Sequence, residues 1–272
     1  MKFSILPIGN HAPNLRNLSN SCYLVQGVGI PLVIDLGYKT FDRLISEIMS
    51  MKLDISKMVI IVSHGHFDHC VDLIKLGRYL RSNKVSGVKL FMPKDNKWYK
   101  IINTLYSSQF DIINLTEKTL YKIGKLKLTF SKTDHCNNKI SSYAIKLELL
   151  NKTIVYTSDI CSVDKNLGAF VRNVDNVIVD SGNPYNRIHL KGYHGNTYQI
   201  TSRLASLNVK NIYITHLKGG MNDKIYLDNA IGNCHITKEG KSILVINTVY
   251  YESKIAGNGE LVDIIDKVDT YA

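Results

Sequence analysis

Short apolar runs alternate with amphipathic stretches along most of the chain, a pattern typical of proteins that mix strands and helices. The apolar and alternating runs predict strands at residues 2–8, 21–26, 30–35, 58–62, 88–92, 120–123, 126–132, 141–149, 153–158, 176–180 and 211–215. Amphipathic stretches predict helices at residues 40–51, 70–81 and 197–207. This order favours an α/β fold in which two mixed sheets pack face to face with helices on the outside.

Three segments add detail to this pattern. The stretch 98–119 contains several aromatic residues but has no clear period, and the tail is predicted to form strands with a turn at residues 257–259. Asn196 is a predicted helix cap, and Gln199 three residues later completes a capping box. The third predicted helix therefore begins close to His194.

The chain has 272 residues and no linker of biased composition, so we expect a single domain over residues 1–272. It carries 34 Lys and Arg residues against 23 Asp and Glu residues, which gives a formal net charge of +11. A basic surface attracts anions, among them nucleic acids and small phosphate esters. An AT-rich genome explains the positive charge equally well, because lysine is spread evenly and Asn and Ile are also plentiful.

The five cysteines are odd in number and form no spaced framework, which favours a reducing compartment. Cys70, Cys136 and Cys161 lie beside the polar motifs described next, and we interpret them as small packing residues. Residues 1–7 are too poor in apolar side chains for a signal peptide, and no run reaches the ~18 apolar residues of a membrane helix. We therefore expect a soluble, cytoplasmic protein without a membrane partner.

The segment SHGHFDH at residues 63–69 holds three imidazoles and one carboxylate directly after the apolar run 58–62. Neutral imidazole and carboxylate are ligands that suit zinc and its first-row neighbours. Four such groups in close succession, with more to follow, exceed the needs of one ion, so we expect two metal ions. A histidine-rich surface loop would not place Asp68 and His69 at the start of an amphipathic helix.

Further polar side chains stand where other predicted strands end. They are Asp35, His135, Asp159, Asp180 and His216. Taken singly, each is explained as a capping group. In layered α/β folds, however, functional sites gather at strand ends, because a rigid core holds the loops there. Together with the segment 63–69, these residues form an ordered set of potential metal ligands.

In this order of motifs the chain resembles the metallo-β-lactamase superfamily over nearly its whole length. The resemblance implies an αββα sandwich with two divalent metal ions, zinc or Mn²⁺. The ligands that it implies are His64, His66 and His135 for one metal, Asp68, His69 and His216 for the other, and Asp159 as the bridge. It also implies that Asp68 acts as a catalytic residue and that Asp35 supports the loop and orients a ligand.

Within the superfamily, the chain looks most like the tRNase Z branch of phosphodiesterases. Asp159 argues against the true β-lactamases, which place Cys or Ser at this position, and Ser142–Ile145 resembles a Ser-(Tyr/Phe) segment of the branch. The branch carries a His before a helix and an acidic residue, more often Glu, at the end of the previous strand. These correspond to His194 as the general acid and Asp180 as its partner, with His189 as a rival for His194.

Residues 160–180 leave no room for the long arm with which tRNase Z grips tRNA. Armless relatives include the phage anti-Pycsar enzymes, which hydrolyse cyclic mononucleotides. The resemblance therefore favours a metal-dependent phosphodiesterase that degrades small cyclic nucleotides used as immune signals. Relatives commonly form pairs, and the aromatic side chains of Trp98, Tyr99, Tyr106 and Phe110 indicate a homodimer contact.

Three alternatives remain. A tRNase Z-like endoribonuclease or another nuclease predicts a groove of basic and aromatic residues that leads RNA or DNA to the metals. A thioester hydrolase of the glyoxalase II type needs no general acid, which would leave His194 and Asp180 without a role. A non-catalytic nucleotide-binding protein would be expected to have lost one or more ligands, and none is missing here.

Overall fold

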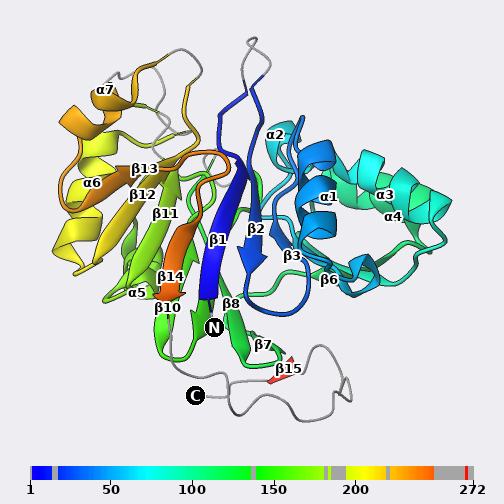
Figure 1. Ribbon diagram of the computed structural model, residues 1–272. Coiled ribbons are helices and arrows are strands. Elements are labelled where there is room, and N and C mark those ends of the chain that lie inside the picture. The colour runs from blue at the N-terminus through cyan, green and yellow to red at the C-terminus, as the bar shows by residue number, and fades with distance from the viewer. Residues whose placement is uncertain are drawn as a thin grey trace.

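The computed structural model describes residues 2–13, 18–135, 139–180, 183–184, 194–218, 221–247 and 267–268. Two mixed β-sheets pack face to face, and helices cover their outer sides (Figure 1). This architecture is the αββα sandwich that the sequence predicts. Within the described part of the chain, no helix has the length and apolar composition needed to cross a membrane.

The first sheet has seven strands in the order β14-β1-β2-β3-β4-β5-β6. Its strands are β1 (Lys2–Gly9), β2 (Cys22–Gln26), β3 (Leu32–Ile34), β4 (Val59–Ile61), β5 (Val88–Met92), β6 (Phe110–Asn114) and β14 (Ile243–Asn247). The pairs from β14 to β3 are antiparallel, whereas those from β3 to β6 are parallel. Strands β3 and β4 therefore end at the same edge of the sheet.

The second sheet has eight strands in the order β13-β12-β11-β10-β9-β8-β7-β15. Its strands are β7 (Leu120–Ile123), β8 (Leu126–Lys132), β9 (Tyr143–Leu149), β10 (Lys152–Tyr156), β11 (Asn176–Asp180), β12 (Asn211–Thr215), β13 (Cys234–Ile236) and β15 (Lys267–Val268). Strands β10 to β13 run parallel to one another. The residues after β10, β11 and β12 consequently meet at one edge.

Seven α-helices and one 3₁₀ helix are described. They are α1 (Phe41–Ser50), η1 (Ile55–Lys57), α2 (Phe67–Cys70), α3 (Leu73–Ser82), α4 (Lys97–Tyr106), α5 (Lys165–Val171), α6 (Thr197–Ser206) and α7 (Asp223–Asp228). Residues of α1, α3 and α4 pack on the first sheet, and residues of α5 and α6 pack on the second. The predicted cap of α6 is confirmed, since Asn196 Oδ1 accepts a hydrogen bond from Gln199 N.

An apolar core fills the space between the two sheets. It includes Phe3, Tyr23, Ile145 and Tyr156, which are all almost completely buried. Burial of apolar surface stabilises such a core by roughly 25 cal/mol per Å². The loops at the strand ends are therefore anchored on a rigid base, and small side-chain changes in them need not unfold the protein.

The predicted helix at residues 70–81 is wrong in one respect, because it is interrupted between Cys70 and Leu73. The backbone groups that would continue the helix pair with the loop after β3 instead. Leu36 N donates to the His69 carbonyl at 2.8 Å, and Asp72 N donates to the Leu36 carbonyl at 3.1 Å. Tertiary hydrogen bonds thus separate the short helix α2, which carries the metal motif, from α3.

The description of residues 98–119 as lacking a period is also wrong, because α4 and β6 lie largely within this segment. Helix α4 is short and buries only Ile102 and Tyr106. The sequence therefore contains one pair of buried apolar residues at helical spacing rather than a repeated pattern. Tyr106 and Phe110 belong to the core beneath the first sheet. These two side chains therefore do not form the exposed aromatic contact that the homodimer prediction assumed.

Candidate metal centre

Three imidazoles converge from two separate loops. His64 and His66 come from the turn after β4, and His135 follows β8. His66 Nδ1 lies 3.0 Å from His64 Nε2 and 3.1 Å from His135 Nε2. Two nitrogen ligands of a tetrahedral zinc ion lie roughly 3.3 Å apart, given Zn–N bonds of about 2.0–2.1 Å. The three nitrogen atoms are therefore spaced as ligands of one ion would be.

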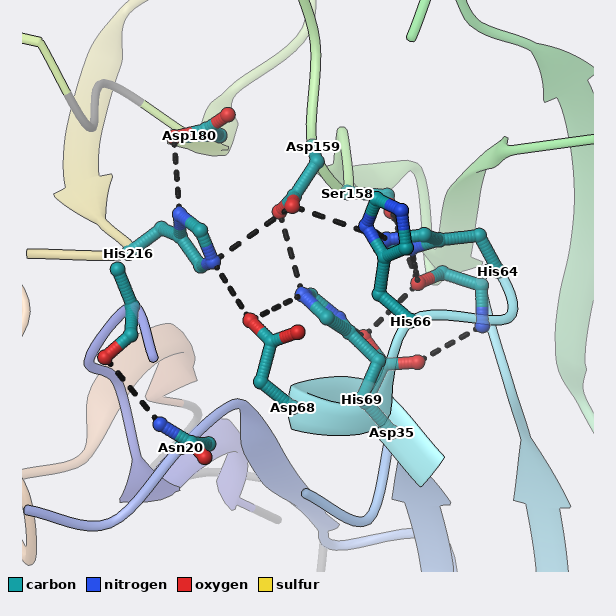
Figure 2. A network of polar contacts seen from close by, with 12 residues as sticks. Asn20, Asp35, His64, His66, Asp68, His69, Ser158, Asp159, Asp180 and His216 are labelled. Atoms are coloured by element: carbon teal, nitrogen blue, oxygen red, sulfur yellow. Dashed lines mark hydrogen bonds and ion pairs between the residues drawn. The ribbon is translucent and has the colours of Figure 1, made fainter. Parts of the chain in front are cut away.

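A second group of polar side chains lies beside the first and combines carboxylates with imidazoles (Figure 2). His216 Nε2 is 3.0 Å from Asp68 Oδ2. His69 Nε2 is 3.4 Å from the same carboxylate and 3.2 Å from Asp159 Oδ1. Helix α2 supplies Asp68 and His69, and the end of β12 supplies His216.

Asp159 is common to both groups. Its Oδ2 atom lies 3.7 Å from His64 Nε2, 3.8 Å from His135 Nε2 and 3.5 Å from His216 Nε2. In each group, one potential ligand atom per residue lies within 4.8 Å of all the others. The structure thus brings all seven sequence-predicted ligands into two adjoining groups that share one carboxylate, and this nitrogen and oxygen donor set suits divalent zinc or manganese.

The protonation state of the histidines in the first group favours the binding of a cation. Burial, together with the neighbouring imidazoles, lowers the pKa of His64 well below its usual value and that of His66 to about 4. Both rings are therefore neutral at physiological pH, with one ring nitrogen unprotonated. Neutral imidazole is the form that a metal ion binds.

In the second group, protonated histidines neutralise the carboxylates, as bound metal ions would. Burial alone would lower the pKa of His69 and His216, but nearby carboxylates, above all Asp159, raise both values well above the usual range. Burial alone would raise the pKa of Asp159, but His216 and His69 hold it well below its usual value. Metal binding at such a group would replace these protons and release them to solvent.

Asp35 is completely buried and fixes the orientation of His69. Its carboxylate accepts hydrogen bonds from Ser63 N at 2.7 Å, from Ser63 Oγ at 2.9 Å and from Tyr156 Oη at 2.8 Å. Asp35 Oδ2 also lies 2.7 Å from His69 Nδ1. With Nδ1 held in this way, His69 Nε2 is directed toward Asp68 and Asp159. Asp35 therefore lies where it can orient a potential ligand, the role that the resemblance implies for it.

A chain of serine hydroxyls holds His64 in the same manner. Ser142 Oγ donates to Ser158 Oγ at 3.3 Å, and Ser158 Oγ donates to Ser63 Oγ at 2.8 Å. His64 Nδ1 lies 3.1 Å from Ser158 Oγ and 3.2 Å from Ser63 Oγ. A proton on Nδ1 satisfies these oxygens and leaves Nε2 free to bind a metal. No role is predicted from the sequence for Ser63, Ser158 or Tyr156, although each stands at or near a strand end beside a predicted site residue.

Three of these strand-end residues have an unusual backbone. Asp35, Ser158 and His216 have φ angles of 57°, 60° and 57°, in the left-handed region that side chains other than glycine rarely adopt. Such conformations cost about 1–3 kcal/mol each and persist where the surrounding structure determines them. The packed strands hold the chain in these turns, which aim the three side chains at the centre.

His194 and Asp180 form a pair next to the second group. His194 Nδ1 lies 2.7 Å from Asp180 Oδ2, and the His194 ring stacks on His216 with centroids 4.8 Å apart. Burial alone would lower the pKa of His194, but Asp180 raises it, and His194 in turn holds the pKa of Asp180 at about 2 against the effect of burial. His194 is therefore poised to carry a proton, and its side chain is 21% exposed. The rival candidate His189 lies outside the described residues.

A family model described as Anti-Pycsar protein Apyc1 matches residues 2–243. The chain belongs to this family. No curated protein matches the chain. The family assignment therefore rests on a match that includes both groups of potential ligands, the His194–Asp180 pair and nearly every described strand of the two sheets.

Solved structures share the fold of this anti-Pycsar family member. The metallo-β-lactamase fold protein YhfI from Bacillus subtilis is 22% identical with a TM-score of 0.77, and the match covers 90% of this chain and all of YhfI. A diphosphatase of the PhnP family is 15% identical with a TM-score of 0.71, with the same coverage of both chains. The short form of human tRNase Z is 16% identical with a TM-score of 0.67, again over 90% and 100% of the two chains. These likenesses establish the metallo-β-lactamase fold.

Proposed function

We propose that this member of the anti-Pycsar family is a dinuclear metal phosphodiesterase that hydrolyses small cyclic nucleotides. The observation that carries the proposal is the position of His194 beside two adjoining groups of potential ligands that share Asp159. The two groups are each of a size that one divalent ion requires. A proton donor at their border is what a phosphodiester, with its poor leaving group, needs.

The chain's own residues divide the work of such a reaction. When bound, two divalent ions supply a water-derived nucleophile near neutral pH and offset negative charge on the phosphate. His64, His66 and His135 would hold one ion and Asp68, His69 and His216 the other, with Asp159 between them. His194 would give a proton to the departing sugar oxygen, because Asp180 holds its Nδ1 and leaves Nε2 to face the substrate.

The His194–Asp180 pair favours a phosphodiester over a thioester as the substrate. A thiolate leaves without protonation, so a glyoxalase II-type site has no use for a buried carboxylate that keeps a histidine protonated. The structural neighbours that are described as tRNase Z make a nuclease the stronger rival. An arm that binds tRNA is not encoded between β10 and β11, where the chain has only α5 and its connections.

A substrate panel tests the proposal directly. We expect the protein, loaded with Zn²⁺ or Mn²⁺, to cleave nucleoside 3′,5′-cyclic phosphates faster than cyclic dinucleotides or precursor tRNA, because nothing in the described residues would grip the tRNA elbow. A bis-p-nitrophenyl phosphate reaction in the same buffers is the control for loading. A clear preference for structured RNA would favour the nuclease, and hydrolysis of thioesters alone would exclude both phosphodiesterase functions.

We further propose that the protein forms a homodimer in which the outer face of α4 contributes to the contact. Ile101 and Leu105 lie one turn apart on this helix and remain 38% and 47% exposed. Burying Ile101 and Leu105 against a second copy of the chain would remove apolar surface from water. Sedimentation velocity over the micromolar range is expected to show a dimer, and Leu105→Asp is expected to dissociate it. A monomer at every concentration would contradict the proposal.

A further inference from the structure

A row of three aromatic side chains, Tyr38, Phe67 and Trp98, borders the candidate metal centre. The Phe67 ring centroid lies 6.0 Å from that of Tyr38 and 6.5 Å from that of Trp98. Phe67 is 53% exposed and Tyr38 is 39% exposed. A contiguous group of exposed aromatic rings indicates a surface that binds a ligand or another protein.

The position of Phe67 ties this aromatic row to the chemistry. Phe67 is the first residue of α2 and stands in the sequence between His66 and Asp68, which belong to the two different groups of potential ligands. Its neighbours in the motif point inward, and Asp68 is only 3% exposed. Phe67 thus presents its ring to solvent from the same short segment that supplies a potential ligand to each group.

Two glycines hold the row in place by close backbone contact. A Cβ atom on Gly37 would lie 2.0 Å from the Asp68 carbonyl oxygen, so only glycine lets the loop that carries Tyr38 approach α2 this closely. A Cβ atom on Gly65 would lie 2.4 Å from Asn96 Oδ1. The same Asn96 oxygen accepts a hydrogen bond from Trp98 N at 2.9 Å. The aromatic row is thus built onto the metal loop and is preorganised.

The chemistry of the aromatic row restricts the kind of ligand that can bind there. Aromatic faces bind flat, polarisable groups, and stacking of a nucleobase on such a face is tolerant of base identity because every base has a π-face. Lys39 Nζ lies 5.7 Å from the Tyr38 ring centroid, and Lys97 is exposed next to Trp98. Positive charge beside the rings favours an anionic ligand over a neutral apolar one. A base joined to a phosphate satisfies both features.

We propose that the aromatic row formed by Tyr38, Phe67 and Trp98 is the stacking platform for the nucleobase of the phosphodiester substrate. The inference rests on the proposed function, which puts the phosphate at the metal centre. Phe67 is the central contact, and the Tyr38 and Trp98 rings both lie next to it. Stacking without hydrogen bonds to base edges predicts that the site accepts both purines and pyrimidines, with purines bound more tightly because of their larger face.

The test compares substrates with and without a base. Adenosine 3′,5′-cyclic phosphate and uridine 3′,5′-cyclic phosphate are measured beside 1-O-methylribose 3′,5′-cyclic phosphate, which keeps the reacting ring and lacks the base. We expect Phe67→Ala to raise KM for the two nucleotides by roughly 5- to 150-fold, the range of alanine substitutions at base-stacking aromatics. The ratio of kcat/KM between nucleotide and base-free diester is expected to fall toward one. Phe67→Trp, which restores an aromatic face, is expected to recover the ratio.

Controls separate this inference from the proposed function and from a structural effect. Met49→Ala, at a 66% exposed side chain on α1, is the matched control for loss of surface apolar area. If the wild-type protein cleaves no phosphodiester, the proposed function fails. If it cleaves nucleotide and base-free diester equally well, or if Phe67→Ala reduces both equally, the platform is excluded while the phosphodiesterase stands. Dissociation of a dimer by Phe67→Ala with an unchanged substrate ratio would make the row a subunit contact and would overturn the proposal.

Discussion

His194→Ala is expected to lower kcat for a nucleoside 3′,5′-cyclic phosphate by roughly 10²- to 10⁴-fold, the contribution typical of a positioned general acid. The physical reason is the leaving group, since a sugar alkoxide must be protonated as the bond breaks. A p-nitrophenolate leaves without that help. The same variant should therefore lose much less activity on bis-p-nitrophenyl phosphate, and the measurement is the ratio of the two losses.

Two further variants sharpen this experiment. Asp180→Asn is expected to show a weaker form of the same selectivity, because Asp180 orients His194 through a 2.7 Å contact and raises its pKa but does not itself meet the substrate. His235→Ala is the matched control, because His235 is an exposed histidine on β13 that stacks on Tyr213 outside the centre. Equal losses on both diesters would remove His194 from the acid role.

Asp68→Ala and His69→Ala are each expected to lower hydrolysis by more than about 100-fold, beyond the 10- to 100-fold loss usual for residues that only support a ligand. Elemental analysis should find about two metal ions per chain in the wild-type protein and about one in each variant. Both residues sit on the short helix α2, above a core that the strands already stabilise. Circular dichroism spectra should therefore match those of the wild-type protein.

The control for this pair is Asp111→Ala, which removes an exposed carboxylate of β6 that pairs with Lys89. It should keep both the metal content and the activity. Full activity in Asp68→Ala or His69→Ala would mean that the residue is not a ligand. A wild-type metal content well under one ion per chain, with activity that survives EDTA, would contradict the whole assignment of the centre.

The sequence predicted the sandwich and the gathering of site residues because both depend on local patterns. Buried strands are visible as short apolar runs, and the residue after each run is visible as a polar one, as with Asp159 after β10. The segment 63–69 needs no tertiary information, because its potential ligands are adjacent in sequence. The family match extends over the same motifs.

What the sequence did not predict depends on contacts between distant segments. The interruption between α2 and α3 arises because the backbone of His69 and Asp72 pairs with Leu36, more than thirty residues earlier in the chain. The roles of Ser158 and Tyr156 arise in the same way, through Ser63 and Asp35. A serine or tyrosine at a strand end has no sequence signal of its own. Only the packed sheets show what it meets.

The hydrogen bonds of Asp35 connect the two groups of potential ligands. Asp35 Oδ2 holds His69 Nδ1 directly, and it also accepts from Ser63 Oγ, which lies 3.2 Å from His64 Nδ1. The same carboxylate therefore positions a histidine of each group, directly for His69 and through Ser63 for His64. A single substitution at Asp35 would consequently disturb a histidine in both groups at once, although Asp35 itself belongs to neither group.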